Sequence, residues 1–353
     1  MKAYVLHGIN DFLSETVPDP LPAENEVVVK VRAVGICGSD IPRIYKTGAH
    51  THPLIPGHEF SGEVVKLGKS VDSKWQGKRV GVFPLIPCGK CAQCQKKQYE
   101  MCQNYNYLGS RRDGGFAEFV AVPAENLIAL PDNVSFEEAA MLEPMAVTVH
   151  AMRRIQPKRN DKVVICGLGT IGLLLLMFLK EAGIEDILVI GNKDFQRDIA
   201  CQIGLDEKCY CDSRKQDADQ WIKEQTNGQG ADVFFECVGK NETYAQAVKN
   251  AAPSGRVMLM GNPYSDMQLE KAVYWNILRN QLTVMGTWNS SFTHDTHDDW
   301  HYVLERLEQK RITPSKMISH HIPFDKLEQG LFIMRDKKED YVKVMGIMQE
   351  YAR

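Results

Sequence analysis

The sequence has neither a strong net charge nor a long hydrophobic run. Its 353 residues include 42 lysines and arginines against 45 aspartates and glutamates, a formal net charge of -3. This balance predicts no basic surface for nucleic acid or for an anionic membrane, so the expected partners are small molecules and copies of the chain itself. The longest apolar run, residues 171–179, is too short to cross a bilayer.

A secretory signal is also absent from the sequence. The first residues, MKAYVLHGINDF, contain no apolar core followed by a small-residue cleavage site. The sequence therefore predicts a cytoplasmic protein. Its ten cysteines would stay reduced in that compartment, so a cluster among them is expected to bind metal rather than to form disulfides.

The pattern of the chain changes near residue 150. Residues 1–148 hold short β-type runs, such as VVVKVRAVGI and AEFVAV, which predict an antiparallel β-rich domain with long loops. Residues 149–288 alternate short apolar strands, such as KVVIC and DILVIG, with helical segments, which predicts βαβ units and a parallel sheet. Residues 289–353 are too few for a third domain and are expected to complete the first.

Four closely spaced cysteines form the most specific pattern. They lie in CGKCAQCQKKQYEMC, where most of the intervening residues are polar or loop-forming, unlike the surroundings of core cysteines. Thiolates at this spacing can surround a tetrahedral Zn²⁺ at roughly 2.3 Å. Because all four positions are thiolates and none is left open, the predicted zinc is structural. Its predicted ligands are Cys88, Cys91, Cys94 and Cys102.

A second metal site can be assembled from three separate segments. GICGSD offers Cys37, PGHEFSG offers His58 and Glu59, and MLEPMAV offers Glu143. One thiolate, one imidazole and one carboxylate with an open position would make a catalytic zinc, which polarises a substrate oxygen. The same residues also fit a packed cysteine and a structural histidine–glutamate pair, so their spacing leaves both interpretations open.

A glycine-rich turn follows the strand KVVIC and precedes a helix. Gly167, Gly169 and Gly172 have the GxGxxG arrangement, with Thr170 and Ile171 at the start of the helix. In this context the turn predicts a dinucleotide-binding fold, in which the helix N-terminus holds a pyrophosphate through its N–H groups and dipole. The alternative is a turn whose glycines serve packing alone.

Together these segments resemble the zinc-dependent medium-chain alcohol and polyol dehydrogenases. GHEFSGEVVKLGKSV, GICGSD, the four-cysteine segment and GLGTIG carry the resemblance, which covers essentially the whole chain. It implies an α/β protein with a GroES-like β-rich catalytic domain and a Rossmann domain, a doubly wound parallel sheet that binds the cofactor. It also implies Cys37, His58 and Glu143 as ligands of a catalytic zinc. Glu59 would lie beside the metal, and Asp40 would fix the His58 ring.

The resemblance further implies an activity, hydride transfer between an alcohol and a nicotinamide cofactor, with two zinc ions per chain. Ser39 matches a hydroxyl that begins a proton relay in the family, although a serine here can also cap a local turn. The phrases CGSDIPRIYKTGAH and YNYLGSRRDGGFAEF most resemble members that oxidise a sugar-alcohol phosphate, such as galactitol 1-phosphate, to the ketose phosphate. The alternative substrate is an unphosphorylated polyol such as sorbitol, or threonine.

Several basic residues are candidates for contact with a substrate phosphate. Guanidinium groups bind phosphate bidentately, although paired arginines in a loop can equally be solvated or bound to carboxylates. The candidates are Lys46, His50, Arg111 and Arg112.

The acidic residue that usually follows a dinucleotide turn by about twenty residues is missing. VIGNKD has Gly191, Asn192 and Lys193 in that place. In NAD-preferring relatives a carboxylate at Gly191 would bind the ribose and repel a 2′-phosphate. Its absence, with positive charge from Lys193 and Arg197, predicts a preference for NADP(H). The alternative is that Asn192 holds the ribose of NAD while Lys193 is solvated.

Two further expectations concern association and rival functions. Relatives are dimers or tetramers, so a homo-oligomer joined through the strand LTVMGTW is expected. A non-enzymatic zinc module that contacts nucleic acid or protein is disfavoured by the acidic net charge. A cofactor-binding protein that has lost catalysis is disfavoured by the intact set of candidate ligands.

Overall fold

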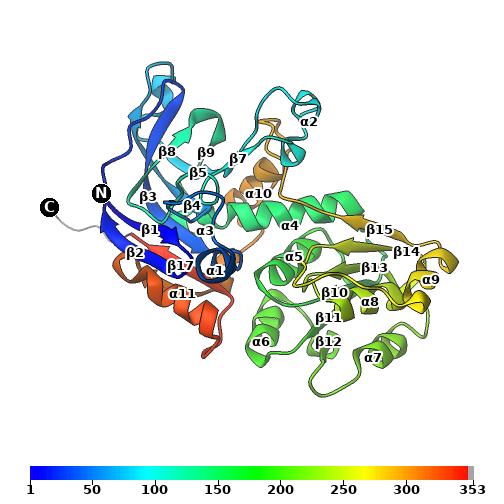
Figure 1. The fold of residues 1–353 in the computed structure, drawn as a ribbon. Helices are drawn as coiled ribbons and strands as arrows, with labels where there is room; N and C mark the ends of the chain where they lie inside the picture. Colours follow the sequence, from blue (N-terminus) through cyan, green and yellow to red (C-terminus); the bar gives the residue numbers. More distant parts are fainter. Residues whose placement is uncertain (349–353) are drawn as a thin grey trace. The chain divides into compact units, whose positions relative to one another are not determined.

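The computed structural model describes residues 1–348 of the chain (Figure 1). It divides into two compact units, Met1–Pro144 with Ser291–Arg353 and Met145–Ser290. The division falls within helix α4 (Leu142–Ile155). None of the helices in the described residues is long and apolar enough to cross a membrane.

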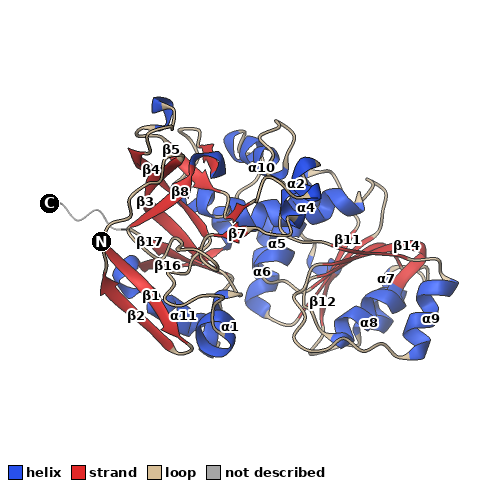
Figure 2. Cartoon of the chain, turned by 45° about the horizontal axis from the view of Figure 1, so that its top comes forward, coloured by secondary structure: helices blue, strands red, loops and turns tan. Residues whose placement is uncertain are grey.

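A seven-stranded sheet forms the first unit (Figure 2). Its strands follow the order β16-β17-β3-β4-β5-β9, and β8 also pairs with β3. All neighbours are antiparallel except β16 and β17, which are parallel. The sequence had predicted an antiparallel domain. The difference arises because α11 (Leu327–Asp336) lies between these two strands, and a helical crossover returns the chain in the same direction. The strands are β3 (Glu26–Ile36), β4 (Glu59–Leu67), β5 (Arg79–Val82), β8 (Phe119–Pro123), β9 (Leu127–Ala129), β16 (Ile318–Pro323) and β17 (Lys343–Ile347).

Short elements complete the first unit. Two antiparallel pairs lie outside the main sheet, β1 with β2 and β6 with β7. Helix α3 begins with a capping box in which Ser135 and Glu138 satisfy each other's backbone N–H groups. These elements are β1 (Lys2–Gly8), β2 (Asp11–Thr16), β6 (Leu85–Ile86), β7 (Asn106–Tyr107), α1 (Asp40–Pro42), the π-helix η1 (Arg43–Thr47), α2 (Ala92–Gln95), α3 (Phe136–Ala140), α10 (Asp299–Glu308) and α11 (Leu327–Asp336).

The second unit is a six-stranded parallel sheet in the order β12-β11-β10-β13-β14-β15. Its central strands are apolar and buried at nearly every position, as a sheet covered on both faces requires. The chain order reverses between β10 and β13, and ligands of such sheets bind at the carboxyl ends of the strands at this point. The strands are β10 (Val163–Cys166), β11 (Ile187–Gly191), β12 (Tyr210–Asp212), β13 (Ala231–Glu236), β14 (Ala251–Leu259) and β15 (Thr283–Gly286).

Helices cover this parallel sheet. In Figure 2, α5 and α6 lie on one face and α7, α8 and α9 on the other. α5 is almost entirely apolar, and its residues from Gly172 to Leu179 are buried, which explains the long apolar run in the sequence. The helices are α5 (Thr170–Glu181), α6 (Asp194–Ile203), α7 (Ala218–Gln225), α8 (Asn241–Asn250) and α9 (Lys271–Arg279).

Candidate metal and cofactor sites

The ends of β3 and β4 bring three predicted metal ligands together. Cys37 directly follows β3, and His58 directly precedes β4, whose first residue, Glu59, lies opposite Gly35 of β3. The Cys37 Sγ, a His58 ring nitrogen and a Glu59 carboxylate oxygen all lie within 4.8 Å of one another. A thiolate, an imidazole and a carboxylate are ligands that Zn²⁺ takes in catalytic sites.

Asp40 is a buried carboxylate that organises this cluster. Its Oδ2 accepts the Cys37 N–H at 2.9 Å, and its Oδ1 accepts from the Arg43 guanidinium at 2.6 Å. The His58 Nδ1 lies 3.6 Å from Asp40 Oδ1 and, among the described residues, has no hydrogen-bond partner although it is buried. A proton on Nδ1 that faces Asp40 would leave Nε2 to bind a metal.

Lys343 is a buried member of the site that the sequence reasoning did not single out. It is the first residue of β17, its Nζ is paired with Glu59 Oε2, and it donates to the Ile36 carbonyl at 3.2 Å. A side chain at Gly35 would overlap both members of the pair, so the glycine leaves room for them. Burial lowers the pKa of Lys343, but Glu59 and Cys37 more than offset this, and the net pKa is raised. The lysine therefore stays charged beside Glu59.

Glu143, in the first turn of α4, is not a member of the 4.8 Å group. Its Oε1 accepts a hydrogen bond from the Tyr107 hydroxyl at 3.1 Å. Burial raises the pKa of the Glu143 carboxyl to about 7, against a lowering effect of His58. Burial, with Glu59, likewise raises the pKa of the Cys37 thiol to about 12. A divalent cation would offset both effects, because it stabilises the charged forms of buried thiol and carboxyl groups.

Three other predicted residues lie in the segment after Cys37. Ser39 is the N-cap residue of α1, but its side chain makes no capping hydrogen bond. The turn-capping alternative is therefore not used. Lys46 and His50 are exposed and, within the described part of the chain, form no ion pair. The structure leaves these two residues outside the metal cluster.

The four cysteines of the loop around α2 lie together, with all four sulfurs within 4.8 Å of one another. The Cys91 Sγ is 3.5 Å from Cys94 Sγ and 3.9 Å from Cys102 Sγ, and the Cys88 Sγ is 3.9 Å from Cys94 Sγ. Sulfurs at roughly 2.3 Å from a tetrahedral Zn²⁺ lie about 3.8 Å apart, so the cluster fits this ion. Backbone N–H groups of Cys94 and Gln103 lower the pKa of the Cys91 thiol to about 6, whereas burial raises the pKa of the Cys94 thiol to about 12. A bound cation would hold both as thiolates.

The glycine-rich turn joins β10 to α5. Gly167 has φ +99°, and a side chain there would press on Val238. A side chain at Gly172 would overlap the Gly167 carbonyl. At Gly169, the N-cap of α5, a Cβ would meet nothing within 4 Å. Packing thus explains the first and third glycines, whereas the second faces open space at a helix N-terminus, where a pyrophosphate fits.

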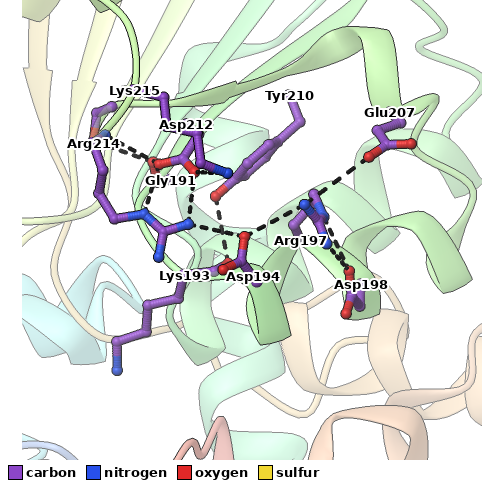
Figure 3. A network of polar contacts seen from close by, with 11 residues as sticks. Gly191, Lys193, Asp194, Arg197, Asp198, Glu207, Tyr210, Asp212, Arg214 and Lys215 are labelled. Atoms are coloured by element: carbon purple, nitrogen blue, oxygen red, sulfur yellow. Dashed lines mark hydrogen bonds and ion pairs between the residues drawn. The ribbon is translucent and has the colours of Figure 1, made fainter.

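Gly191, the last residue of β11, is covered by Tyr210 from β12 (Figure 3). A Cβ at Gly191 would lie 2.9 Å from both Cε2 and the hydroxyl oxygen of Tyr210. The buried tyrosine therefore fills the space that a longer side chain at Gly191 would need, and its hydroxyl donates to the Lys193 carbonyl at 3.4 Å. Asn192 is exposed.

Arg197 lies in a network of carboxylates (Figure 3). Its guanidinium is 2.7 Å from Asp198 and 3.4 Å from Asp194. Arg214, which the sequence reasoning missed, joins Asp194 at 2.9 Å to Asp212 at 2.6 Å and holds the pKa of Asp212 well below its usual range. Both guanidinium groups thus have acidic partners.

The adjacent arginines of the loop after β7 have different surroundings. The Arg112 guanidinium is 2.5 Å from the carboxylate of Glu26. Burial acts to raise the pKa of Glu26, but hydrogen bonds from Arg112 and the Ala23 N–H outweigh it, so the pKa is lowered. The Arg111 guanidinium instead lies 4.6 Å from the centre of the Tyr105 ring. Arg112 therefore fits the carboxylate-bound alternative, and Arg111 does not.

Two family models match the chain. Residues 23–132 match the alcohol dehydrogenase GroES-like domain, and residues 170–309 match the zinc-binding dehydrogenase domain. Galactitol 1-phosphate 5-dehydrogenase of Escherichia coli K12 is 33% identical over 90% of this chain and 92% of its own length. Sorbitol dehydrogenase of Halalkalibacterium halodurans is 31% identical over 98% of both chains. L-threonine 3-dehydrogenase of Pyrococcus horikoshii is 32% identical over 92% of both.

Solved structures of dehydrogenases have the same fold as this chain. A crystal structure of galactitol-1-phosphate dehydrogenase from Escherichia coli has a TM-score of 0.91 at 32% identity and covers 98% of this chain and 100% of that one. A zinc-binding dehydrogenase from Sinorhizobium meliloti bound to NADP has a TM-score of 0.88 at 28% identity, with 98% of each chain covered. An alcohol dehydrogenase from Escherichia coli complexed with NADH has a TM-score of 0.89 at 27% identity, and the match covers 98% of this chain and 99% of that one.

Proposed function

Since the chain belongs to the zinc-dependent medium-chain alcohol and polyol dehydrogenases and is an oxidoreductase, we propose that it transfers a hydride between a sugar-alcohol phosphate and a nicotinamide cofactor. The observation that carries this proposal is the cluster of Cys37, His58 and Glu59 in a chain that also has a dinucleotide turn. A galactitol 1-phosphate-like alcohol would yield the ketose phosphate. The relatives named for sorbitol and threonine have comparable identity, so the phosphate is the part of the proposal that needs its own support.

Two zinc sites complete the proposal. Cys37 and His58, with Glu59 or Glu143, would hold a zinc ion that acts as a Lewis acid on a substrate oxygen. The four cysteines around α2 would hold a second, structural zinc, because four thiolates leave no position for substrate.

The chain's own residues prepare this chemistry. Asp40 Oδ1 lies 3.6 Å from His58 Nδ1, where it would fix the orientation of the ring when Nε2 binds a metal, and Lys343 places a positive charge beside Glu59. The Ser39 residue lies two positions beyond Cys37, and its hydroxyl makes no capping bond at α1. We propose that this hydroxyl accepts the proton of the substrate alcohol and passes it on. Placing a hydroxyl within reach of the reacting proton is the requirement for such a transfer.

We further propose that NADP(H) is the preferred cofactor. Tyr210 fills the space beside Gly191, where an acidic side chain would otherwise bind the ribose of NAD and repel a 2′-phosphate. Lys193 follows Gly191 by two residues and supplies positive charge. Arg197 is bound to carboxylates. Lys193, the N-cap residue of α6, is the residue that we propose for contact with a 2′-phosphate. Neighbours of similar TM-score bind NADP in one case and NADH in the other, so the fold accommodates both cofactors. Initial rates with NADP⁺ and NAD⁺ at matched concentrations test this point, and a kcat/KM that clearly favours NAD⁺ would refute it.

The second unit has a surface suited to a second copy of the chain. β15 ends the order of the parallel sheet, so one of its edges has no strand partner among the described residues. The neighbouring α9 exposes Tyr274, Trp275 and Leu278, each more than half exposed. Aromatic side chains and an open strand edge favour association. We propose a homo-oligomer formed here, and light scattering would measure its mass.

A substrate panel tests the main proposal. The purified protein should show a much higher kcat/KM for galactitol 1-phosphate than for galactitol, sorbitol or threonine. Equal values for the phosphorylated and free polyols would remove the phosphate from the proposal and favour the unphosphorylated alternative. A higher value for threonine would replace the polyol altogether.

A further inference from the structure

The loop that follows β7 is packed directly against the segment that leads to the metal cluster. Gly114 donates its N–H to the Ile55 carbonyl at 2.7 Å, and Gly115 donates to Gly57, the residue before His58, also at 2.7 Å. A side chain at Gly109 or Gly114 would overlap the Gly57 carbonyl. Such close backbone contacts leave the loop little freedom to move relative to His58.

Three aromatic and imidazole rings connect this loop to the cluster. The Tyr105 ring lies edge-on to the Tyr107 ring, with centres 6.2 Å apart. The Tyr107 ring lies 5.9 Å from the His58 ring, and its hydroxyl donates to Glu143. The backbone N–H of Arg111 donates to the Tyr107 carbonyl at 2.9 Å, which turns the loop back toward these rings. Arg111 is thus tied to the cluster through both its backbone and its side chain.

Charge distinguishes Arg111 from its basic neighbours. The Arg43 guanidinium is bound to Asp40, and the Arg112 guanidinium is bound to Glu26. Arg111 is exposed and, in the part of the chain that the structure describes, no carboxylate lies within ion-pair distance of it. Its guanidinium carbon lies over the face of Tyr105, 4.6 Å from the centre of the ring, a contact that occupies one side of the group and leaves its N–H groups able to donate.

We propose that Arg111 binds the phosphate of the substrate and that Tyr105 is the residue that positions its guanidinium. The proposal rests on the proposed function, because it needs an alcohol whose reacting carbon lies at the cluster and whose phosphate lies several carbons away. A planar guanidinium held over an aromatic ring suits bidentate binding of a phosphate, since the contact restricts the group before the ligand arrives. The arginine thereby makes the enzyme selective for the phosphorylated polyol.

The test compares kcat/KM for galactitol 1-phosphate with kcat/KM for galactitol in the zinc-loaded enzyme and its variants. Arg111→Gln should lower the ratio of the two values by about tenfold to a hundredfold, as the loss of a charge-assisted bidentate contact predicts. Arg111→Lys should recover part of the ratio, because lysine keeps the positive charge but lacks the paired N–H groups that bind a phosphate bidentately. Tyr105→Phe, which keeps the ring, should retain the ratio, whereas Tyr105→Leu should lower it.

Lys69→Gln is the matched control, because it removes one positive charge from an exposed turn of the same unit, and its ratio should equal that of the wild type. A second measurement uses inorganic phosphate as an inhibitor of galactitol oxidation, and Arg111→Gln should raise its inhibition constant. An unchanged ratio in Arg111→Gln, or an equal fall for both substrates, would overturn the assignment of Arg111 while leaving the proposed function in place. A wild-type ratio near one would instead overturn the phosphorylated substrate, and this inference with it.

Discussion

Replacing Gly191 with aspartate tests how the end of β11 selects the cofactor. An acid at this position would favour NAD⁺, because its carboxylate can accept hydrogen bonds from the ribose hydroxyls and repel a 2′-phosphate. The structure adds a condition that the sequence did not contain. Tyr210 lies over Gly191, so the new side chain fits only if the tyrosine moves or is also replaced. The informative variant is therefore the double substitution Gly191→Asp with Tyr210→Val.

The magnitudes follow from these contacts. A Cβ at residue 191 would stand 2.9 Å from the Tyr210 ring, and overpacking of this kind costs about 1–3 kcal/mol. Hydrogen bonds to a charged carboxylate contribute about 1.5–3 kcal/mol to NAD⁺ binding. Repulsion of a 2′-phosphate adds about 1 kcal/mol for each pair of like charges about 4 Å apart in water. The double variant should shift the ratio of kcat/KM values toward NAD⁺ by roughly a hundredfold to a thousandfold.

The assay measures kcat/KM for NADP⁺ and NAD⁺ in four proteins, the wild type, the two single variants and the double variant, together with a thermal melt of each. Gly191→Asp alone should melt at a lower temperature and shift the preference less than the double variant does. Tyr210→Val alone should keep the preference for NADP⁺. A single variant that reverses the preference with no loss of stability, or a double variant that keeps the wild-type preference, would refute the role of Gly191 and Tyr210 in cofactor selection.

Three further predictions concern pairs and clusters elsewhere in the chain. Lys343→Met leaves Glu59 buried without a counter-charge and should lower the free energy of unfolding by about 3–5 kcal/mol in a denaturant titration. Adding Glu59→Gln to this variant should restore most of the loss. If the losses of the two single variants simply add in the double variant, the ion pair does not contribute as described. Asp298, 2.9 Å from His301 Nδ1, raises the pKa of His301 in the folded protein. The contribution of this pair to the free energy of unfolding is therefore complete below about pH 6.5 and is lost as pH rises through the raised native pKa. Thermal melts of His301→Gln should therefore show a deficit at about pH 6 that shrinks at about pH 9, and a deficit independent of pH would contradict this. Cys94→Ala should reduce the zinc content from two ions per chain to one, measured by metal analysis of the purified protein, and two retained ions would exclude the four-cysteine site.

The parallel sheet could be predicted because buried strands of this kind are apolar along their whole length. β10 is VVIC and is buried at all four positions, so its character is visible in the sequence without knowledge of its neighbours. The four-cysteine cluster is likewise local, since its ligands lie within one short loop. Both features could therefore be predicted from short stretches of sequence, because neither depends on contacts with distant parts of the chain.

The partners of the site residues could not be predicted, because they depend on register between distant strands. Lys343 and Glu59 are 284 residues apart in the chain and meet because β17 and β4 both pair with β3. Tyr210 reaches Gly191 because β12 pairs with β11, and no pattern in VIGNKD indicates it. Nor does the sequence GSRRDGGF distinguish Arg111 from Arg112, since the difference depends on where Glu26 and Tyr105 lie.

The most direct test of the account follows formation of the reduced cofactor when purified enzyme is mixed with galactitol 1-phosphate or with galactitol, each with NADP⁺ and with NAD⁺. The pair of galactitol 1-phosphate and NADP⁺ should give the highest kcat/KM, chelation of zinc should abolish the rate, and the product should be a ketose phosphate. No reduction of either cofactor by any of these alcohols, with both metal sites loaded, would contradict it.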